Sequence, residues 1–258
     1  MNDLDLEEVR SWARAGGQIA RQMFNHVTAR RKADRTLVTE ADEQIERVLV
    51  ERIMARYPDH GILGEESTRH TTEREFVWAI DPIDGTNAFV AGLPLWAVSI
   101  GLLRKGQPYA GVIHLPLMDD DYWVAPEGPA YLNSDPLSAR GSHPIESEDW
   151  LAVPSNIHRR FSIDFIGKVR SLGSTALGFC YVARGSAAGA LIAYSSLWDI
   201  AAGLAIVGAA GGTMVGLSGQ QLDTATLLDG NQMIEPQIVA PAGLAETLRQ
   251  GVKRLPAR

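Results

Sequence analysis

The sequence predicts an α/β fold, α+β in its layering, in which layers of helix alternate with layers of sheet. Two amphipathic helical patterns come first, a run of short strand-like segments follows, and the second half alternates strands with helices. The chain has 258 residues, 45% of them hydrophobic, so it can bury a substantial core as one compact unit.

Helices are expected to open the chain, followed by strands. Apolar residues recur at helical spacing from residue 4 toward residue 27, behind Asp3 as a cap. A second helix is expected from about Asp42 to Tyr57, where Pro58 disfavours its continuation. Strands are expected over residues 61–63, 76–80, 97–103, 109–114 and 121–125, with an antiparallel hairpin around residues 105–108.

The second half is expected to alternate strands and helices. The expected strands are residues 151–153, 170–172, 188–193, 213–215 and 237–240. The expected helices are residues 157–168, a segment from Thr175, residues 199–209 and a terminal segment. Residues 131–149, rich in Ser, Pro, Asp and Glu, are either the boundary between two halves or an ordinary surface loop. We divide the chain into an α+β half, residues 1–140, and an α/β half, residues 141–258.

Composition excludes several kinds of protein. The net charge is -7 with scattered basic residues, so nucleic acid is not expected as the main ligand. Cys180 is the single cysteine, so no disulfide can form within the chain, and we expect a small buried hydrophobe rather than a reactive thiol. The first residues lack a basic and apolar leader, which predicts a cytoplasmic protein. The apolar residues 197–217 contain a charge and several glycines, so no membrane span is expected.

Residues 78–89 carry the strongest chemical signal, because a buried strand there runs into Asp-Pro-Ile-Asp-Gly-Thr. Pro82 fixes one φ angle and lacks an amide donor, so Asp81 and Asp84 can converge across a tight turn. Two convergent carboxylates attract a hard cation, and Mg²⁺ prefers oxygen ligands, to which the carbonyl of Ile83 can be added. The alternative is an acidic turn that caps a helix.

Three other segments could join this turn. Gly85 and Thr86 stand where a helix could begin, and unpaired amides at a helix start favour a phosphate. Glu65 follows a short strand and is a credible metal ligand. Asp199 is a solitary carboxylate in an apolar setting, where it needs a partner or a metal; its alternative role is a helix cap.

Together these segments resemble the inositol monophosphatase family of metal-dependent phosphatases. The resemblance rests on Gly-Glu-Glu-Ser at residues 64–67, Trp-x-Ile-Asp-Pro-Ile-Asp-Gly-Thr at residues 78–86, and Trp-Asp-x-Ala-Ala-Gly at residues 198–203. It extends to Val-Thr-Glu-Ala-Asp at residues 38–42 and to the Gly-Gly turn at residues 211–212. The resemblance implies a sandwich of alternating helix and sheet layers, and a homodimer.

The resemblance also implies a metal site with two or three Mg²⁺ ions. One ion would be held by Glu65, Asp81 and the carbonyl of Ile83, and a second by Asp81, Asp84 and Asp199. Most of these ligands come from residues 1–140, whereas residues 141–258 would contribute Asp199 and the leaving-group pocket.

Catalytic and substrate-binding roles follow from the same resemblance. The residues expected to act in catalysis are Glu65, Thr86 and Asp42, the last two by positioning or activating the attacking water. The residues expected around the substrate are Gly85, Thr86, Asp84, Ser155, Ser174 and Asp199. Ser155 and Ser174 lie in strand-to-helix connections, so they either line the leaving-group pocket or cap helices.

The implied function is Mg²⁺-dependent hydrolysis of a small alcohol or polyol phosphate, of the inositol monophosphate or histidinol phosphate type, by a metal-activated water. Inositol-specific members usually carry a glutamate where this chain has Ile192. The connector at residues 32–42 is more similar to histidinol-phosphatase-like members, with Leu37 in place of a proline. The alternatives are a nucleotide 3′-phosphate or fructose bisphosphate at the same site, or a regulatory binding protein that retains the fold.

Overall fold

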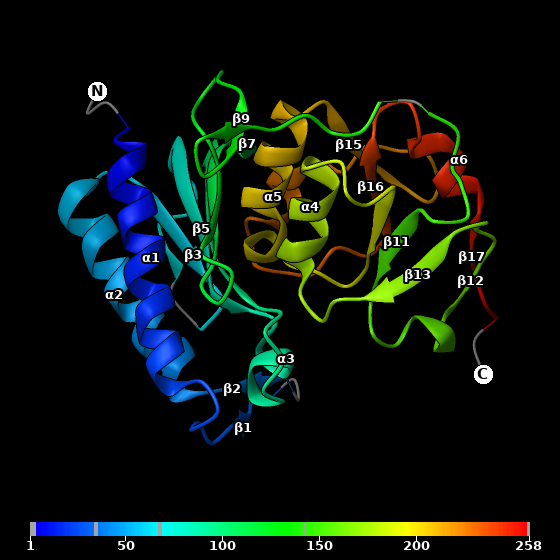
Figure 1. The fold of residues 1–258 in the computed structure, drawn as a ribbon. Helices are drawn as coiled ribbons and strands as arrows, with labels where there is room; N and C mark the ends of the chain where they lie inside the picture. Colours follow the sequence, from blue (N-terminus) through cyan, green and yellow to red (C-terminus); the bar gives the residue numbers. More distant parts are fainter. Residues whose placement is uncertain (1–3, 34–35, 67–68, 142, 257–258) are drawn as a thin grey trace.

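The computed structural model describes residues 4–33, 36–66, 69–141 and 143–256, and its architecture is layered. The helices are α1 (Leu6–Met23), α2 (Glu40–Arg56), α3 (Thr86–Val90), α4 (Thr175–Ala183), α5 (Leu197–Ala209) and α6 (Ala245–Gln250). Helices α1 and α2 cover one face of a large sheet, while α4 and α5 lie between its other face and a second sheet (Figure 1). Helix α6 packs on the outer side of the second sheet. The predicted alternation of helix and sheet layers is confirmed.

The first two helices begin and end at residues suited to that purpose. Helix α1 starts after Asp5, whose side chain accepts a hydrogen bond from the amide of Glu8 at 3.1 Å. Asp3, the cap expected from the sequence, lies outside the described residues. Helix α2 starts after Thr39 and ends before Tyr57, as the following proline requires. The buried sides of both helices form one apolar cluster with the large sheet.

The large sheet is built from the first half of the chain. Its strands are β3 (Gly61–Gly64), β4 (Arg69–His70), β5 (Phe76–Asp84), β6 (Ala97–Arg104), β7 (Gln107–Leu115), β8 (Asp120–Val124), β9 (Ala130–Leu132) and β10 (Asp135–Pro136), in the order β10-β9-β8-β7-β6-β5-β3-β4. Strands β6 and β7 form the predicted hairpin. Lys105 and Gly106 both have positive φ angles, 52° and 77°, which matches the twist of a tight hairpin turn.

The second sheet comes from the other half. Its strands are β11 (Trp150–Val153), β13 (Lys168–Ser171), β14 (Gly189–Ile192), β15 (Gly212–Gly216) and β16 (Gln237–Pro241), in the order β13-β11-β14-β16-β15. Two small ribbons pair β1 (Arg30–Arg31) with β2 (Leu37–Val38), and β12 (Phe161–Ile163) with β17 (Val252–Arg254). Residues 137–149 join the two sheets without a described helix or strand, and the boundary near residue 140 stays a prediction.

The helix predicted over residues 157–168 is wrong. That segment contains a short 3₁₀ turn, Ile157–Arg159, and then strand β12. Phe161 and Ile163 alternate with Ser162, which is a strand period, and their partner strand β17 lies near the C-terminus. A pairing between segments so far apart in the sequence leaves no local signal, so periodicity over a short window could not identify it.

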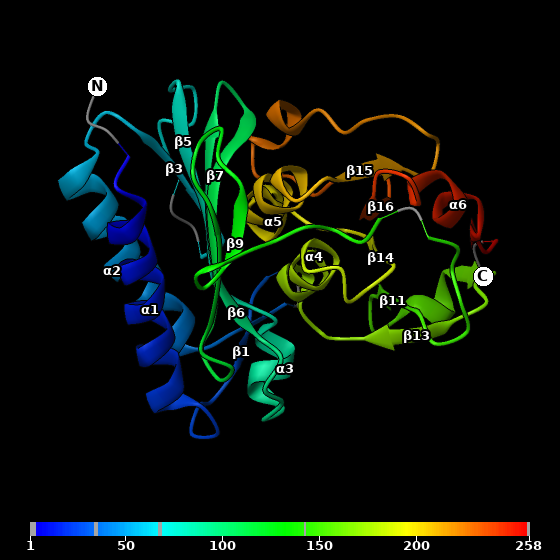
Figure 2. The same cartoon turned by 45° about the horizontal axis from the view of Figure 1, so that its top comes forward.

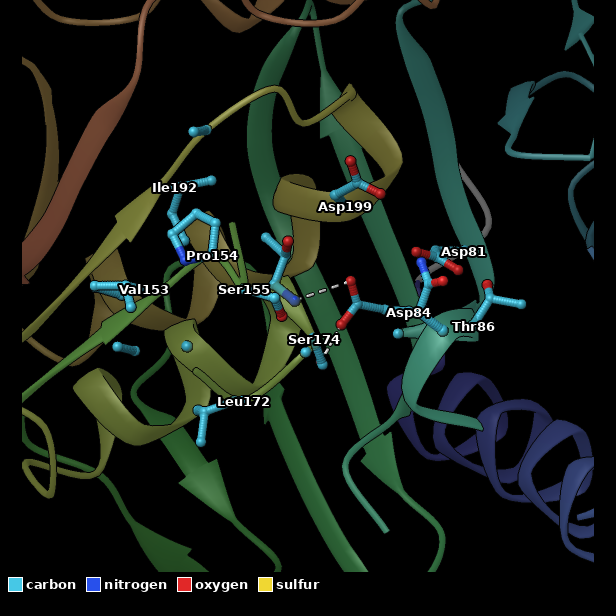
Figure 3. Close-up of a pocket in the computed structure, with 18 of the residues that line it drawn as sticks. Asp81, Asp84, Thr86, Val153, Pro154, Ser155, Leu172, Ser174, Ile192 and Asp199 are labelled. Carbon is cyan, nitrogen blue, oxygen red and sulfur yellow. Dashed lines mark hydrogen bonds between the residues drawn. The ribbon is translucent and has the colours of Figure 1, made fainter. Parts of the chain in front are cut away.

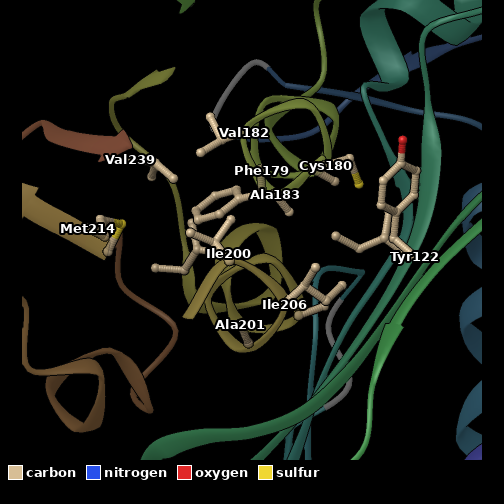
Figure 4. Packing of buried hydrophobic residues seen from close by; sticks show 14 of the residues in the cluster. Tyr122, Phe179, Cys180, Val182, Ala183, Ile200, Ala201, Ile206, Met214 and Val239 are labelled. Carbon is tan, nitrogen blue, oxygen red and sulfur yellow. The ribbon is translucent and has the colours of Figure 1, made fainter. Parts of the chain in front are cut away.

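The core between the two sheets depends on close packing of α4 and α5 (Figure 2). Figure 4 shows Phe179 and Cys180 from α4 beside Ile200, Ala201 and Ile206 from α5. Cys180 is fully buried, and burial raises the pKa of its thiol, which agrees with the predicted role as a small hydrophobe. None of the described helices has the length and hydropathy needed to cross a bilayer.

Candidate active site and metal centre

Two carboxylates at the end of β5 are brought to the same face of the large sheet by a bulge. Side chains alternate along a strand, so residues three apart normally point to opposite faces. In this structure Asp81 is opposite Ser99, whereas Asp84 is opposite Ala97, and the register shifts between them. The extra residue in β5 turns Asp84 to the side of Asp81. The amide of Ile83 donates to Asp81 Oδ1 at 3.0 Å and fixes that carboxylate.

A third carboxylate arrives from the opposite half of the chain. Asp199 lies in the first turn of α5, where its Oδ2 accepts a hydrogen bond from the amide of Ser196 at 2.6 Å. Asp81, Asp84 and Asp199 each offer an oxygen, and these oxygens all lie within 4.8 Å of one another. Figure 3 shows the three side chains facing a shared space between β5 and α5. Asp199 therefore caps the start of α5 and also belongs to the carboxylate cluster.

Helix α4 holds Asp84 in place from the other side. The hydroxyl of Ser174 donates to Asp84 Oδ2, and the amides of Thr175 and Ala176 donate at 3.2 and 2.9 Å. Ser174 is also the cap of α4, since its oxygen accepts from an amide in the first turn. Ser174 therefore caps a helix and also lines the cavity, while its role beside the leaving group stays a prediction.

Asp42 lies behind Thr86 rather than in the cavity itself. Its Oδ2 accepts from the amide and hydroxyl of Thr39 at 2.8 and 2.5 Å. Thr86 Oγ1 lies 3.3 Å from Asp42 Oδ1 and 3.1 Å from the carbonyl of Ile83. Burial raises the pKa of Asp42 to about 6, although the bonds from Thr39 lower it. A buried acceptor thus lies within hydrogen-bonding distance of the Thr86 hydroxyl, which lines the cavity beside the acidic cluster.

Glu65 is held at the edge of the cluster by a lysine. Lys32 Nζ lies 3.0 Å from Glu65 Oε1 and 2.7 Å from Glu66 Oε1. The amide of Glu66 donates to Glu46 Oε2 at 2.7 Å, and that carboxylate packs so closely on Gly64 that a Cβ there would lie 2.6 Å away. Sequence reasoning missed Glu46, although it lies on the buried stripe of α2 one turn after Asp42.

The electrostatics of the cluster favour a bound cation. Burial, followed by the charges of Glu65 and the other carboxylates, raises the pKa of Asp81 and of Asp199 well above the usual range. Burial raises the pKa of Asp84 to about 6, against the hydrogen bonds from Ser174 and two amides. Adjacent buried carboxylates repel one another, and a divalent cation between them would offset that cost. The oxygen donor set suits Mg²⁺.

The carboxylates line one side of a cavity of about 270 Å³. Every predicted site residue except Asp42 contributes to its lining. On the acidic side these residues are Glu65, Asp81, Ile83, Asp84, Gly85, Thr86 and Asp199. On the other side are Ser155 and Ser174, together with apolar residues, of which sequence reasoning singled out Ile192 but not Val153 or Leu172.

Comparison with known proteins identifies the class. The sequence matches the inositol monophosphatase family over residues 5–253. It is 31% identical to a fructose-1,6-bisphosphatase/inositol-1-monophosphatase of Aquifex aeolicus, with 92% of this chain and 94% of that protein covered. It is also 31% identical to a histidinol-phosphatase of Chlorobaculum parvum, with 94% and 98% covered. A solved inositol monophosphatase of Thermotoga maritima superposes with a TM-score of 0.83 at 25% identity, covering 95% of each chain.

The fold and these matches define a hydrolase of phosphate monoesters. More narrowly, the chain belongs to the inositol monophosphatase family. Family members depend on metal ions, generally Mg²⁺, and the acidic cluster of this chain is consistent with that dependence.

Proposed function

We propose that the protein hydrolyses a small alcohol phosphate with Mg²⁺ held by Glu65, Asp81, the Ile83 carbonyl, Asp84 and Asp199. The observation that carries this proposal is the approach of three carboxylates, two buried and one half-buried, to within 4.8 Å beside a cavity. The carbonyl oxygen of Ile83 lies 3.1 Å from Thr86 Oγ1, and even if it accepts that hydrogen bond it keeps a second lone pair for a metal. When bound, two or three cations would lower the pKa of a water and neutralise charge on the phosphoryl group.

The protein's own groups would orient the attacking water. The hydroxyl of Thr86 can donate to Asp42 and accept a hydrogen bond from a water on its cavity side. The raised pKa of Asp42, about 6, suits a group that accepts a proton near neutral pH. The water oxygen would bond to phosphorus as the bond to the ester oxygen breaks, and the released alcohol would take up a proton.

The phosphate and the alcohol would occupy different parts of the cavity. The amides of Gly85 and Thr86 would hold the phosphate, with Asp84 and Asp199 close by. Gly85 has a φ of 97°, and a Cβ there would lie 3.0 Å from the carbonyl of Leu95, so glycine is required at this turn. The alcohol would lie on the side of Ser155 and Ser174.

The named relatives support more than one substrate. They include a histidinol-phosphatase and a fructose-1,6-bisphosphatase/inositol-1-monophosphatase, so a phosphate of the inositol or histidinol type and fructose bisphosphate are both candidates. The rival function, a binding protein that acts through a partner, is disfavoured by the clustering of Asp81, Asp84 and Asp199 beside the cavity. The cytoplasmic location and the homodimer stay predictions.

Phosphate release from p-nitrophenyl phosphate and a panel of small phosphate esters tests this function. We expect release with Mg²⁺, its loss after chelation and its return when Mg²⁺ is restored. Thr86→Val keeps the shape but removes the hydroxyl, and it should lower kcat by about 100-fold. Thr86→Ser restores the hydroxyl and is the matched control. Equal activity with and without Mg²⁺, or equal kcat in Thr86→Val and Thr86→Ser, would contradict the proposed chemistry.

A further inference from the structure

The cavity has an apolar wall opposite its acidic side. Figure 3 shows Val153, Pro154 and Ile192 on the side away from Asp81, with Leu172 below them. Val153 ends β11 and Ile192 ends β14, and these two strands pair in parallel. Val153 and Ile192 are 7% and 4% exposed, so their positions are fixed by the packing of the second sheet. The wall is a rigid part of the fold.

The serine hydroxyls on this side, those of Ser155 and Ser174, are each hydrogen-bonded within the protein. Ser174 donates to Asp84 and accepts from the amide of Leu177. Ser155 Oγ and Ser171 Oγ lie 2.8 Å apart and are hydrogen-bonded to each other. The charged residues among the described lining are Glu65, Asp81, Asp84 and Asp199, all on the acidic side. A substrate hydroxyl or charge pressed against the apolar wall would therefore lose water without gaining an equivalent partner.

We infer that the leaving alcohol is compact and uncharged, with an alkyl or aromatic skeleton and few hydroxyl groups, and that Val153, Leu172 and Ile192 select it. This inference rests on the proposed phosphatase function, and it disfavours the polyol and charged substrates that the names of the relatives suggest. An apolar pocket distinguishes substrates by the apolar area that it contacts and by the cost of burying a hydroxyl group without a hydrogen-bond partner. One such group changes kcat/KM by roughly 10- to 100-fold. A polyol phosphate carries several such groups and is disfavoured.

Two esters with the same ring provide the test. Cyclohexyl phosphate and inositol 1-phosphate share a six-membered carbon ring and differ in the hydroxyls on it. The quantity to measure is the preference, defined as kcat/KM for cyclohexyl phosphate divided by kcat/KM for inositol 1-phosphate. Comparing this preference between wild type and variants cancels the different intrinsic reactivity of the two alcohols.

Two near-isosteric variants make the wall polar. Leu172→Asn changes a half-buried side chain, and Val153→Thr adds a hydroxyl to a buried one. In both, we expect the preference to fall by about tenfold or more. Leu222→Asn is the matched control, because Leu222 is half-buried but does not line the cavity, and its preference should stay within about twofold of wild type. Thermal unfolding of each variant verifies that it is folded.

The outcomes separate the two proposals. A preference that is unchanged or increased in both wall variants, with p-nitrophenyl phosphate still hydrolysed by the wild type, would overturn the inference about the leaving group alone. Absence of phosphate release from every ester, p-nitrophenyl phosphate included, would overturn the phosphatase function and this inference with it. A fall in both wall variants but not in Leu222→Asn supports the assignment.

Discussion

Asp81→Asn is expected to lower kcat/KM for phosphate release by about 1000-fold, while the metal-free variant unfolds at a higher temperature than the metal-free wild type. The activity falls because Asp81 would ligate both proposed cations, and an amide is a poor substitute for a charged ligand. Phosphate release and thermal unfolding, each with and without Mg²⁺, provide the two readouts.

Asp81→Asn is expected to raise stability while it lowers activity, and the reason is the pKa of Asp81 in the folded protein. The folded protein raises the pKa of Asp81, chiefly through burial, so its carboxyl group destabilises the metal-free fold once the pH exceeds the unfolded value near 4. At neutral pH the folded, metal-free protein bears this cost, because the same carboxyl group ionises freely in water in the unfolded chain. Asparagine has no charge to desolvate and removes that cost. Added Mg²⁺ should raise the unfolding temperature of the wild type and leave that of Asp81→Asn nearly unchanged.

Asp121→Asn is a control variant for which the opposite change in stability is expected. Asp121 is buried like Asp81, but its partners are the ring nitrogen Nδ1 of His114 and the guanidinium group of Arg14, each 2.7 Å from one of its oxygens. Burial opposes its charge, yet His114, Arg14 and Arg10 together lower the pKa of Asp121. Asp121→Asn should therefore lower the unfolding temperature and keep the dependence of phosphate release on Mg²⁺. If both variants changed stability in the same direction, the proposed charge repulsion at Asp81 would be wrong.

Gly101→Ala is expected to destabilise the protein by about 1–3 kcal/mol and to weaken Mg²⁺ binding at the same time. Gly101 in β6 faces α5, and a Cβ there would lie 2.6 Å from Ala201 Cβ and 2.7 Å from the amide of Ala202. A Cβ added at its cross-strand partner Gly111 would lie 2.7 Å from the Cα of Ala202 in the same helix. A methyl group must therefore push α5 away from the sheet.

The effect on Mg²⁺ arises because α5 carries Asp199 in its first turn, directly before the contact with Gly101. A displacement of about 1 Å in a catalytic group can cost up to about 100-fold in rate. Gly208→Ala is the matched control on the same helix, since nothing lies within 4 Å of its Cβ position. It should stabilise the protein by about 0.5–1 kcal/mol. Calorimetric titration with Mg²⁺ and thermal unfolding compare the two variants.

The sequence predicted most elements and the contents of the acidic cluster, because both leave local signals. Helical periodicity and a proline defined α1 and α2, and the hairpin turn at residues 105–106 was recognisable from its composition. Pro82 correctly indicated that Asp81 and Asp84 converge. Their side chains reach the same face of the sheet because β5 forms a β-bulge where it pairs with β6. That bulge depends on the partner strand and could not be derived from β5 alone.

Features that depend on contacts between segments far apart in the sequence were not predicted. The sequence predicts a helix where strand β12 forms, because the partner strand β17 lies near the C-terminus and leaves no signal in the local sequence. Most of the apolar wall of the cavity was missed for the same reason. Sequence reasoning named Ile192, but Val153 and Leu172 carry no local signal that the fold places them opposite Asp81. Glu46 did have a signal, a charged residue on the buried stripe of α2, which sequence reasoning overlooked.

Diffraction at the manganese absorption edge from crystals soaked in Mn²⁺ tests the metal site most directly, because Mn²⁺ accepts the oxygen ligands that suit Mg²⁺. We predict an anomalous peak in contact with the carboxylates of Asp81, Asp84 and Asp199, and its loss in Asp81→Asn. An absence of any peak between these three side chains, with Mn²⁺ bound elsewhere or not at all, would contradict a cation-dependent active site at this position.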